Sequence, residues 1–208
     1  MVAIEGIDGS GKTTQAKLLE DLLRIEGYDA ARFKEPTDGP WGRKIKAIAH
    51  SQRRDLTPAA IDREVELFIR DRQHDVSRNI RPALRRKAIV VMDRYYHSSI
   101  AYQGMLATIG LDEVRRRNER IAVRPSIVFL LDVPPVISMS RIGRCGVNGT
   151  RRGSTTFEDE ENLERVREAF LKLHDPIIHT IDGTLPRGAI LDSIFNVVSD
   201  IASSMERP

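Results

Sequence analysis

The 208-residue chain contains a single cysteine, few aromatic residues and no long apolar run. One thiol, Cys145, excludes an internal disulfide and is typical of a reducing compartment. No apolar segment approaches the roughly 18 residues of a membrane-spanning helix, and the first residues lack the basic and long apolar regions of a secretory signal. We therefore expect a cytoplasmic protein with no membrane partner.

Lysine is also scarce, because only seven of the 33 basic residues are lysine and the others are arginine. Guanidinium groups form paired hydrogen bonds to phosphate and carboxylate oxygens, so this bias suits either polyanion binding or surface ion pairs. The formal net charge is only +3, since 30 acidic residues offset the basic ones. An excess this small does not indicate binding to DNA or RNA, and we expect no nucleic-acid partner.

Five short apolar segments have the character of buried strands, and amphipathic segments separate them. The five are residues 1–5, 28–33, 88–93, 126–133 and 176–182. Apolar strands that alternate with helices form a parallel sheet with helices on both faces. The sequence therefore predicts an α/β fold with a five-stranded parallel sheet in one domain, residues 1–208. Catalytic groups of such folds lie at the carboxyl ends of the strands.

Two helices carry clear boundary signals. Residues 12–26 place their leucines on one face, and Gly27 is typical of a helix stop. A longer amphipathic segment, 56–87, has Thr57 as a candidate N-cap and Pro58 at the first helical position.

The glycine-rich segment GIDGSGKT at residues 6–13 matches the P-loop pattern G-x-x-x-x-G-K-[ST], and it lies between an apolar strand and a helix. Glycines let backbone N–H groups turn inward, and the helix adds its positive N-terminus, so the segment suits the phosphates of a nucleoside triphosphate. Lys12 would bridge the outer phosphates, and Thr13 would offer its hydroxyl to Mg²⁺. A plain glycine-rich turn is the alternative. The expected phosphate-binding residues are Gly6, Asp8, Gly9, Ser10, Gly11, Lys12, Thr13 and Thr14.

An acid and an arginine follow the third apolar segment. Asp93 ends this segment, at the position of a Walker B acid that contacts Mg²⁺ or its water shell, and Arg94 would point into an acceptor cleft. Such a pair at the surface contributes little, but its place at the end of a buried strand favours function. The chain lacks the N-K-x-D segment of GTPases, and its length suits a small P-loop kinase.

Residues 93–104, DRYYHSSIAYQG, closely resemble the D-R-[YH]-x-x-S-x-x-A-Y-[QS] segment of thymidylate kinases. Residues 5–19 resemble the N-terminal signature of that family, 66–84 its nucleobase-binding helix, 157–173 the helix after its lid, and 181–184 its penultimate loop. The resemblance spans nearly the whole chain. It implies a three-layer P-loop NTPase fold with a lid, ATP and dTMP as substrates, Mg²⁺ and a homodimer.

The resemblance also implies a base site. Phe68 would stack on the thymine ring, and Arg72, one turn further along the helix, would donate to a base carbonyl. Ser99 would bind the base edge, and Gln103 is a further candidate there. For Phe68, Ser99 and also Tyr102, packing in the protein interior is the alternative.

Three further residues would hold the sugar and phosphate of the acceptor. Tyr102 would lie under the sugar and favour deoxyribose, and Asp8 would accept a hydrogen bond from the 3′-hydroxyl. Arg94 would bind the 5′-phosphate. The family often has REPGG after the second strand where this chain has KEPTDG, so the second ligand of that phosphate stays open between Lys34 and Arg43.

The lid, at about residues 141–157, is rich in glycine, arginine and threonine and has no periodicity. The family supplies a catalytic arginine from the P-loop or from the lid, and this P-loop carries none. The sequence therefore resembles the lid-arginine type, unless the arginines belong to a plain solvated loop. The lid arginines are Arg141, Arg144, Arg151 and Arg152, and the spacing does not select among them. The candidate catalytic residues are Lys12, Asp93, Arg94, Arg151 and Arg152.

These observations predict ATP-dependent phosphorylation of dTMP to dTDP. Two alternatives stay open: a kinase for another nucleoside monophosphate or a deoxynucleoside, and a nucleotide-binding module without catalysis. The five histidines have no paired metal-ligand spacing. The basic segment at residues 115–120 has the character of a solvated helix face.

Overall fold

The structure is a computed structural model, which describes residues 1–49, 57–144 and 160–205. Its centre is a five-stranded sheet in which all neighbouring strands are parallel, in the order β2-β3-β1-β4-β5. The strands are β1 (Val2–Glu5), β2 (Ala30–Lys34), β3 (Ile89–Asp93), β4 (Ile127–Asp132) and β5 (Ile178–Asp182). Each strand coincides with one of the five apolar segments to within about two residues, so the predicted sheet is confirmed.

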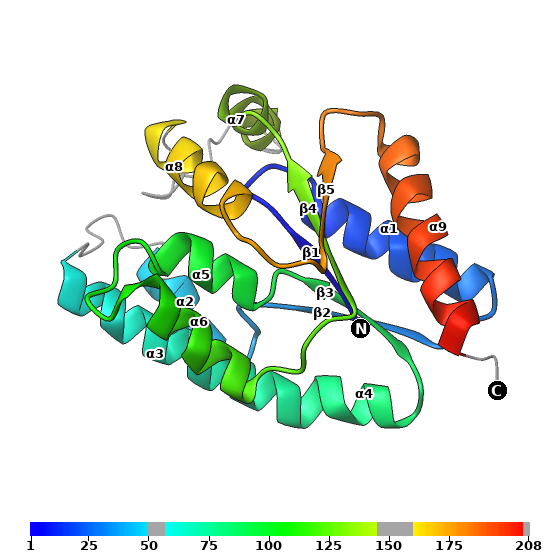
Figure 1. Cartoon of the computed structure of the whole chain (residues 1–208), viewed down its shortest axis with the longest axis horizontal. Helices are drawn as coiled ribbons and strands as arrows, with labels where there is room; N and C mark the ends of the chain where they lie inside the picture. Colours follow the sequence, from blue (N-terminus) through cyan, green and yellow to red (C-terminus); the bar gives the residue numbers. More distant parts are fainter. Residues whose placement is uncertain (50–56, 145–159, 206–208) are drawn as a thin grey trace.

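Helices cover both faces of the sheet, as the alternating pattern predicts (Figure 1). On β1, Val2 and Ile4 pack on one face and Ala3 on the other, because successive side chains of a strand alternate. The first face is covered by α1 (Lys12–Ile25) and α9 (Arg187–Met205). The second face is covered mainly by α3 (Pro58–Asp75), α5 (Tyr96–Gln103) and α8 (Glu160–Leu171).

The register brings the carboxyl ends of three strands together. Asp93 pairs with Ile4 of β1 and with Lys34 of β2. In the sheet, β2 and β3 lie on one side of β1, and β4 and β5 lie on the other. The strand β1 therefore lies at the point where the strand order reverses. Ligands of open α/β sheets bind outside the carboxyl ends at such a point.

The predicted long helix at residues 56–87 is continuous, but it contains a wider turn. It consists of α3, a π-helical turn η1 (Val76–Ile80) and α4 (Arg81–Arg85). Thr57 caps the start, as predicted, because its side chain accepts a hydrogen bond from the backbone N–H of Ala60. Pro82 has no N–H for the usual bond to the fourth residue before it, which gives a reason for the wider turn in front of it.

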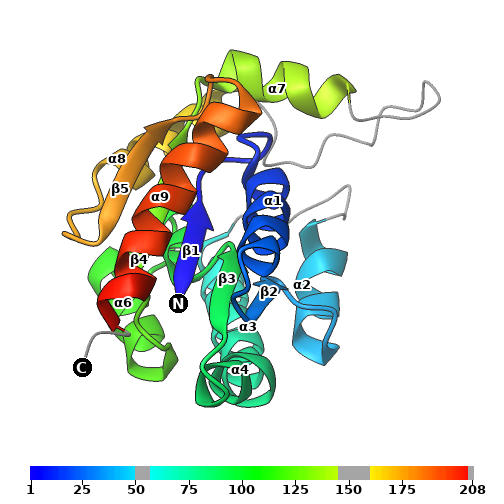
Figure 2. The ribbon, with the colours of Figure 1, turned by 90° about the vertical axis from the view of Figure 1, so that its right-hand side faces the viewer.

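The remaining helices are α2 (Pro40–Ala49), α6 (Gly110–Ile121) and α7 (Pro135–Arg144). Figure 2 shows α7 at the top, beyond the carboxyl ends of the strands. Residues 141–144, the start of the predicted lid, are therefore helical rather than irregular. The rest of that segment, including Arg151 and Arg152, lies outside the described residues. No helix in the described parts of the chain is long and apolar enough to cross a membrane.

Candidate active site

The P-loop joins β1 to α1, and at two of its positions both the backbone and the packing require glycine. Gly6 and Gly9 have φ values of 140° and 76°, which L side chains rarely adopt. A Cβ on Gly6 would lie 2.6 Å from the carbonyl oxygen of Leu131, and one on Gly9 would lie 2.5 Å from that of Ser138. The loop therefore packs too closely on its neighbours to carry side chains at these positions.

Lys12 is buried inside this loop. Its ammonium group donates to the backbone oxygen of Ile7 and lies 3.4 Å from the hydroxyl of Ser10. Burial, followed by the nearby charge of Arg94, lowers the pKa of Lys12 to about 7. The charges of Asp8, Asp93 and Glu5 act against this fall, and a phosphate group bound in the loop would add to them. Thr14 lies beyond it in the first turn of α1, half-buried.

Thr13 and Asp93 form the predicted Mg²⁺ site. The hydroxyl of Thr13 donates to Asp93 Oδ2 over 2.6 Å, and the ammonium of Lys34 lies 3.6 Å from the same oxygen. The other oxygen, Oδ1, is buried and has no donor among the described residues. Magnesium at phosphate sites binds one or two protein oxygens together with waters and substrate phosphates, so this pair fits it. Within the described residues no group of three His, Cys, Asp or Glu side chains could hold a metal.

Asp8, Arg94 and Tyr102, which we call the acceptor cluster, meet beside the P-loop. The guanidinium group of Arg94 forms an ion pair with Asp8 and lies 5.2 Å from the ring of Tyr102. The hydroxyl of Tyr102 donates to Asp8 Oδ2 over 3.1 Å. Burial disfavours ionisation of Asp8, but the charges of Arg94 and Lys12 outweigh it and lower the pKa of the carboxyl group. Burial raises the pKa of Tyr102, which stays a neutral donor. The cluster combines a cation for an anionic group with an acceptor for a hydroxyl.

Glu35, Arg72, Ser99 and Asn118 form a second buried group, the Arg72 cluster. Only 1% of Arg72 is exposed. Its Nε donates to Glu35 Oε2 over 2.9 Å, one Nη contacts the oxygen of Asn118, and the other lies 3.3 Å from the hydroxyl of Ser99. The structure thus brings together Arg72 and Ser99, which the family resemblance implies for one base site.

The other two predicted base-site residues lie on α3 and α5. Phe68 precedes Arg72 by one turn and is partly exposed, outside both core clusters of the described residues. Gln103 is buried, and its side-chain oxygen has no donor in the described part of the chain. The assignment of both residues to the base site stays a prediction.

Two members of the Arg72 cluster were missed by sequence reasoning. Glu35 belongs to the KEPTDG segment, and Asn118 to residues 115–120, for which we expected a solvated face. That expectation was wrong for Asn118, which is fully buried together with Val114 one turn earlier. The spacing of four residues between Val114 and Asn118 was the signal that could have shown it.

Two adjacent residues of α3 fix the loop after β2. Asp71 accepts hydrogen bonds from the backbone N–H and the hydroxyl of Thr37, over 2.8 and 2.6 Å, while Arg72 holds Glu35. Of the two open candidates for the acceptor phosphate, Lys34 lies at Asp93, whereas Arg43 donates to the backbone oxygen of Asp38 at an exposed position. The choice between them stays a prediction.

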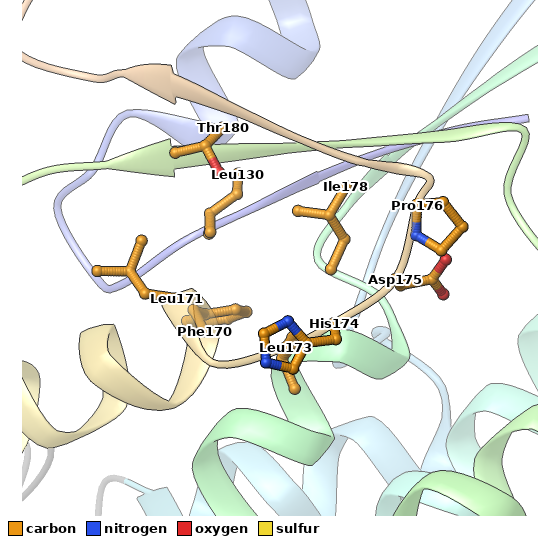
Figure 3. A pocket seen from close by; sticks show the side chains of 9 residues that line it. All are labelled: Leu130, Phe170, Leu171, Leu173, His174, Asp175, Pro176, Ile178 and Thr180. Atoms are coloured by element: carbon orange, nitrogen blue, oxygen red, sulfur yellow. The ribbon is translucent and has the colours of Figure 1, made fainter.

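A pocket of about 400 Å³ lies apart from these groups, between β4, β5 and the end of α8 (Figure 3). Leu130, Phe170 and Thr180 are among its lining residues. Phe170 separates it from the acceptor cluster, because its ring packs edge-on against Tyr102 with 6.2 Å between ring centres. None of the residues that line this pocket is a predicted catalytic or binding residue.

One end of the parallel sheet holds three features. They are a P-loop after the first strand, an acid at the end of a neighbouring strand, and an arginine beside that acid. This arrangement places the protein among the P-loop phosphotransferases.

Sequence comparison gives the particular family. The sequence model of the family described as thymidylate kinase matches residues 4–194. A thymidylate kinase of Xanthomonas oryzae is 41% identical over 191 residues, which cover 92% of this chain and 79% of the relative. A probable thymidylate kinase of Archaeoglobus fulgidus is 39% identical, over 95% of this chain and 94% of its own length. A thymidylate kinase of Xylella fastidiosa is 40% identical, over 97% and 91%. The chain belongs to the thymidylate kinase family.

Proposed function

We propose that this protein transfers the γ-phosphoryl group of ATP to dTMP and releases ADP and dTDP. The acceptor cluster carries the proposal, because it sets a guanidinium group and a hydroxyl acceptor beside the P-loop. A deoxynucleoside monophosphate presents an anionic phosphate and a 3′-hydroxyl, which match Arg94 and Asp8. Tyr102 closes the space beside them, where a 2′-hydroxyl would lie, and so favours deoxyribose.

The reaction needs no covalent enzyme intermediate. An oxygen of the acceptor phosphate attacks the γ-phosphorus in line, and the bond from that phosphorus to the β–γ bridging oxygen breaks. Lys12 stabilises negative charge on the donor phosphates, and Arg94 holds the acceptor phosphate. Thr13 and Asp93 would hold Mg²⁺. When bound, the ion neutralises charge on the β- and γ-phosphate oxygens. Arg151 and Arg152 remain the predicted catalytic arginines of the lid.

An acceptor panel with ATP and Mg²⁺ tests the substrate. We expect the highest kcat/KM for dTMP, with dUMP, dCMP and thymidine lower, because the family resemblance assigns Phe68, Arg72 and Ser99 to a thymine site and Arg94 to the acceptor phosphate. A faster reaction with any of the other three acceptors would contradict the dTMP assignment, but it would still show that the protein is a kinase. Tight ATP binding without transfer to any acceptor would instead favour a nucleotide-binding module.

Two further proposals remain. A homodimer is supported by the family resemblance alone, and a cytoplasmic location is supported by the single cysteine and the lack of a long apolar run. Sedimentation equilibrium of the purified chain would test the first, and fractionation of the producing cell would test the second.

A further inference from the structure

Glu5, the last residue of β1, is a fully buried acid that the proposed phosphoryl transfer does not use. Its carboxylate accepts three hydrogen bonds from one segment. Oε1 accepts from the backbone N–H groups of Tyr95 and Ser98, over 2.8 and 3.2 Å, and Oε2 accepts from the hydroxyl of Ser98, over 2.6 Å. Glu5 therefore caps the start of α5, where the N-cap residue Tyr95 makes no side-chain capping bond.

The segment that is bonded to Glu5 also holds Arg94. The hydroxyl of Ser98 that donates to Glu5 also accepts from Arg94 Nη1 over 3.1 Å. The backbone of Arg94 has a φ of 70°, a left-handed conformation that is uncommon for arginine. It is fixed on both sides by β1, since the N–H of Arg94 donates to the oxygen of Ile4 and the next N–H donates to Glu5.

Glu5 and Asp8, two acids close to Arg94, differ in burial. Asp8 pairs directly with the guanidinium, and 37% of its side chain is exposed. Glu5 is inaccessible to any ligand. Burial raises the pKa of Glu5, while the bond from Ser98 and the charge of Arg94 act against that rise. Because no ligand can reach Glu5, its bonds to this segment do not compete with a bound acceptor.

We propose that Glu5 is a positioning residue for the acceptor phosphate: through Ser98 and the backbone of Tyr95 it holds Arg94 in its left-handed conformation, with the guanidinium directed at that phosphate. The proposal rests on the proposed function, because it takes Arg94 as the phosphate ligand. It predicts a defect in binding the phosphate of the acceptor, and none in binding ATP or the nucleoside part of the acceptor.

Two variants of the full chain test this role, Glu5→Gln and Ser98→Ala. Glutamine keeps the size and one acceptor oxygen but loses the charge, and alanine removes only the link between the carboxylate and the guanidinium. Calorimetry with dTMP, thymidine and an ATP analogue separates the contributions. We expect about tenfold weaker binding of dTMP to each variant, with thymidine and nucleotide affinities within about twofold of the wild type. The two changes act on one chain of bonds, so their effects should not add.

Glu20→Gln is the matched control. Glu20 is also almost buried, and it accepts bonds from the backbone and side chain of Arg32 over 3.1 and 3.0 Å, but it lies on α1. We expect this variant to bind dTMP as the wild type does. A comparable loss of dTMP affinity in this control would overturn the proposal, because any buried acid would then serve.

Unchanged dTMP affinity in Ser98→Ala, or an equal loss for dTMP and thymidine, would also overturn it. Ser98→Ala decides the matter if Glu5→Gln fails to fold, which the melting temperature would show. Phosphorylation of dTMP by the wild-type protein in the same preparation keeps the proposed function separate, since that activity can stand while Glu5 proves to have only a structural role.

Discussion

The P-loop and the Arg72 cluster are both buried and rich in hydrogen bonds, yet they are assembled in different ways. The P-loop consists of eight consecutive residues whose backbone geometry decides what binds. The Arg72 cluster joins side chains from the loop after β2, from α3, from α5 and from α6, and Arg72 is 46 residues from Asn118 in the sequence. A contiguous site leaves a readable pattern in the sequence, whereas a site built from distant side chains depends on the complete fold.

The largest effect is expected at the contiguous site. Lys12→Ala should lower kcat for phosphoryl transfer by about 10³-fold, because it removes a preorganised cation from the developing charge. The fold should survive, since the change also removes a buried ammonium whose solvation is poor. Steady-state kinetics and circular dichroism measure the two effects. Retained transfer would contradict the assignment of the P-loop as the phosphate site.

At the assembled site, the expected loss is one of stability as well as activity. Arg72→Met should destabilise the protein by about 3 kcal/mol, because it leaves Glu35 buried without its ion-pair partner. The double variant Arg72→Met with Glu35→Leu should recover much of that stability but not the activity towards dTMP. Chemical denaturation and kinetics of the same samples provide the measurement.

Arg70→Met is the control for this prediction. Arg70 lies two residues earlier on α3 and pairs with Glu66 at a position where half of its side chain is exposed. Its loss should change stability by less than about 1 kcal/mol. Equal destabilisation by the two single variants would mean that burial of the Arg72 pair is not the cause.

A smaller effect is expected from backbone geometry. Gly9→Ala should destabilise the protein by about 2 kcal/mol and weaken ATP binding, because the φ of 76° and the carbonyl of Ser138 both oppose a Cβ. Gly143→Ala in α7 is the control, since no atom of the described residues lies within 4 Å of the added carbon and alanine favours a helix. Thermal unfolding should therefore shift in opposite directions for the two variants. A shift in the same direction would contradict the close approach of the P-loop to α7.

Features that are contiguous in the sequence could be predicted from it, whereas features assembled from distant residues could not. The five strands were predictable because each is an apolar run, and the P-loop was recognisable as a motif because its residues are contiguous. The π turn before Pro82 was not predicted, because periodicity over 32 residues resembles that of one regular helix. Glu35 and Asn118 were missed because each is polar, and only tertiary contacts with Arg72 bury them.

The role of Glu5 shows the same limit inside a readable motif. Its place next to the P-loop glycine is plain in the sequence, but its partners lie about 90 residues away, at Tyr95 and Ser98. The serine of the D-R-Y-x-x-S pattern is Ser98, whereas sequence reasoning chose Ser99 for the base site and gave Ser98 no role. Both serines prove to be buried and bonded to an arginine of the site, Ser98 to Arg94 and Ser99 to Arg72.

The smallest effect concerns pH, and it acts on ATP binding and stability with opposite signs. Because the pKa of Lys12 is about 7, the amine loses its proton above that pH, and ATP affinity should fall by up to about tenfold per pH unit. In the unfolded chain the pKa returns to its ordinary value of 10.5, so between pH 7 and that value the unfolded state binds more protons and this group adds stability as pH rises. Calorimetry in buffers of different ionisation enthalpy should detect proton uptake on ATP binding at pH 8. Lys12→Arg, which stays charged, should bind ATP with a flat profile, and an equally flat wild-type profile would show that Lys12 keeps its proton in the empty loop.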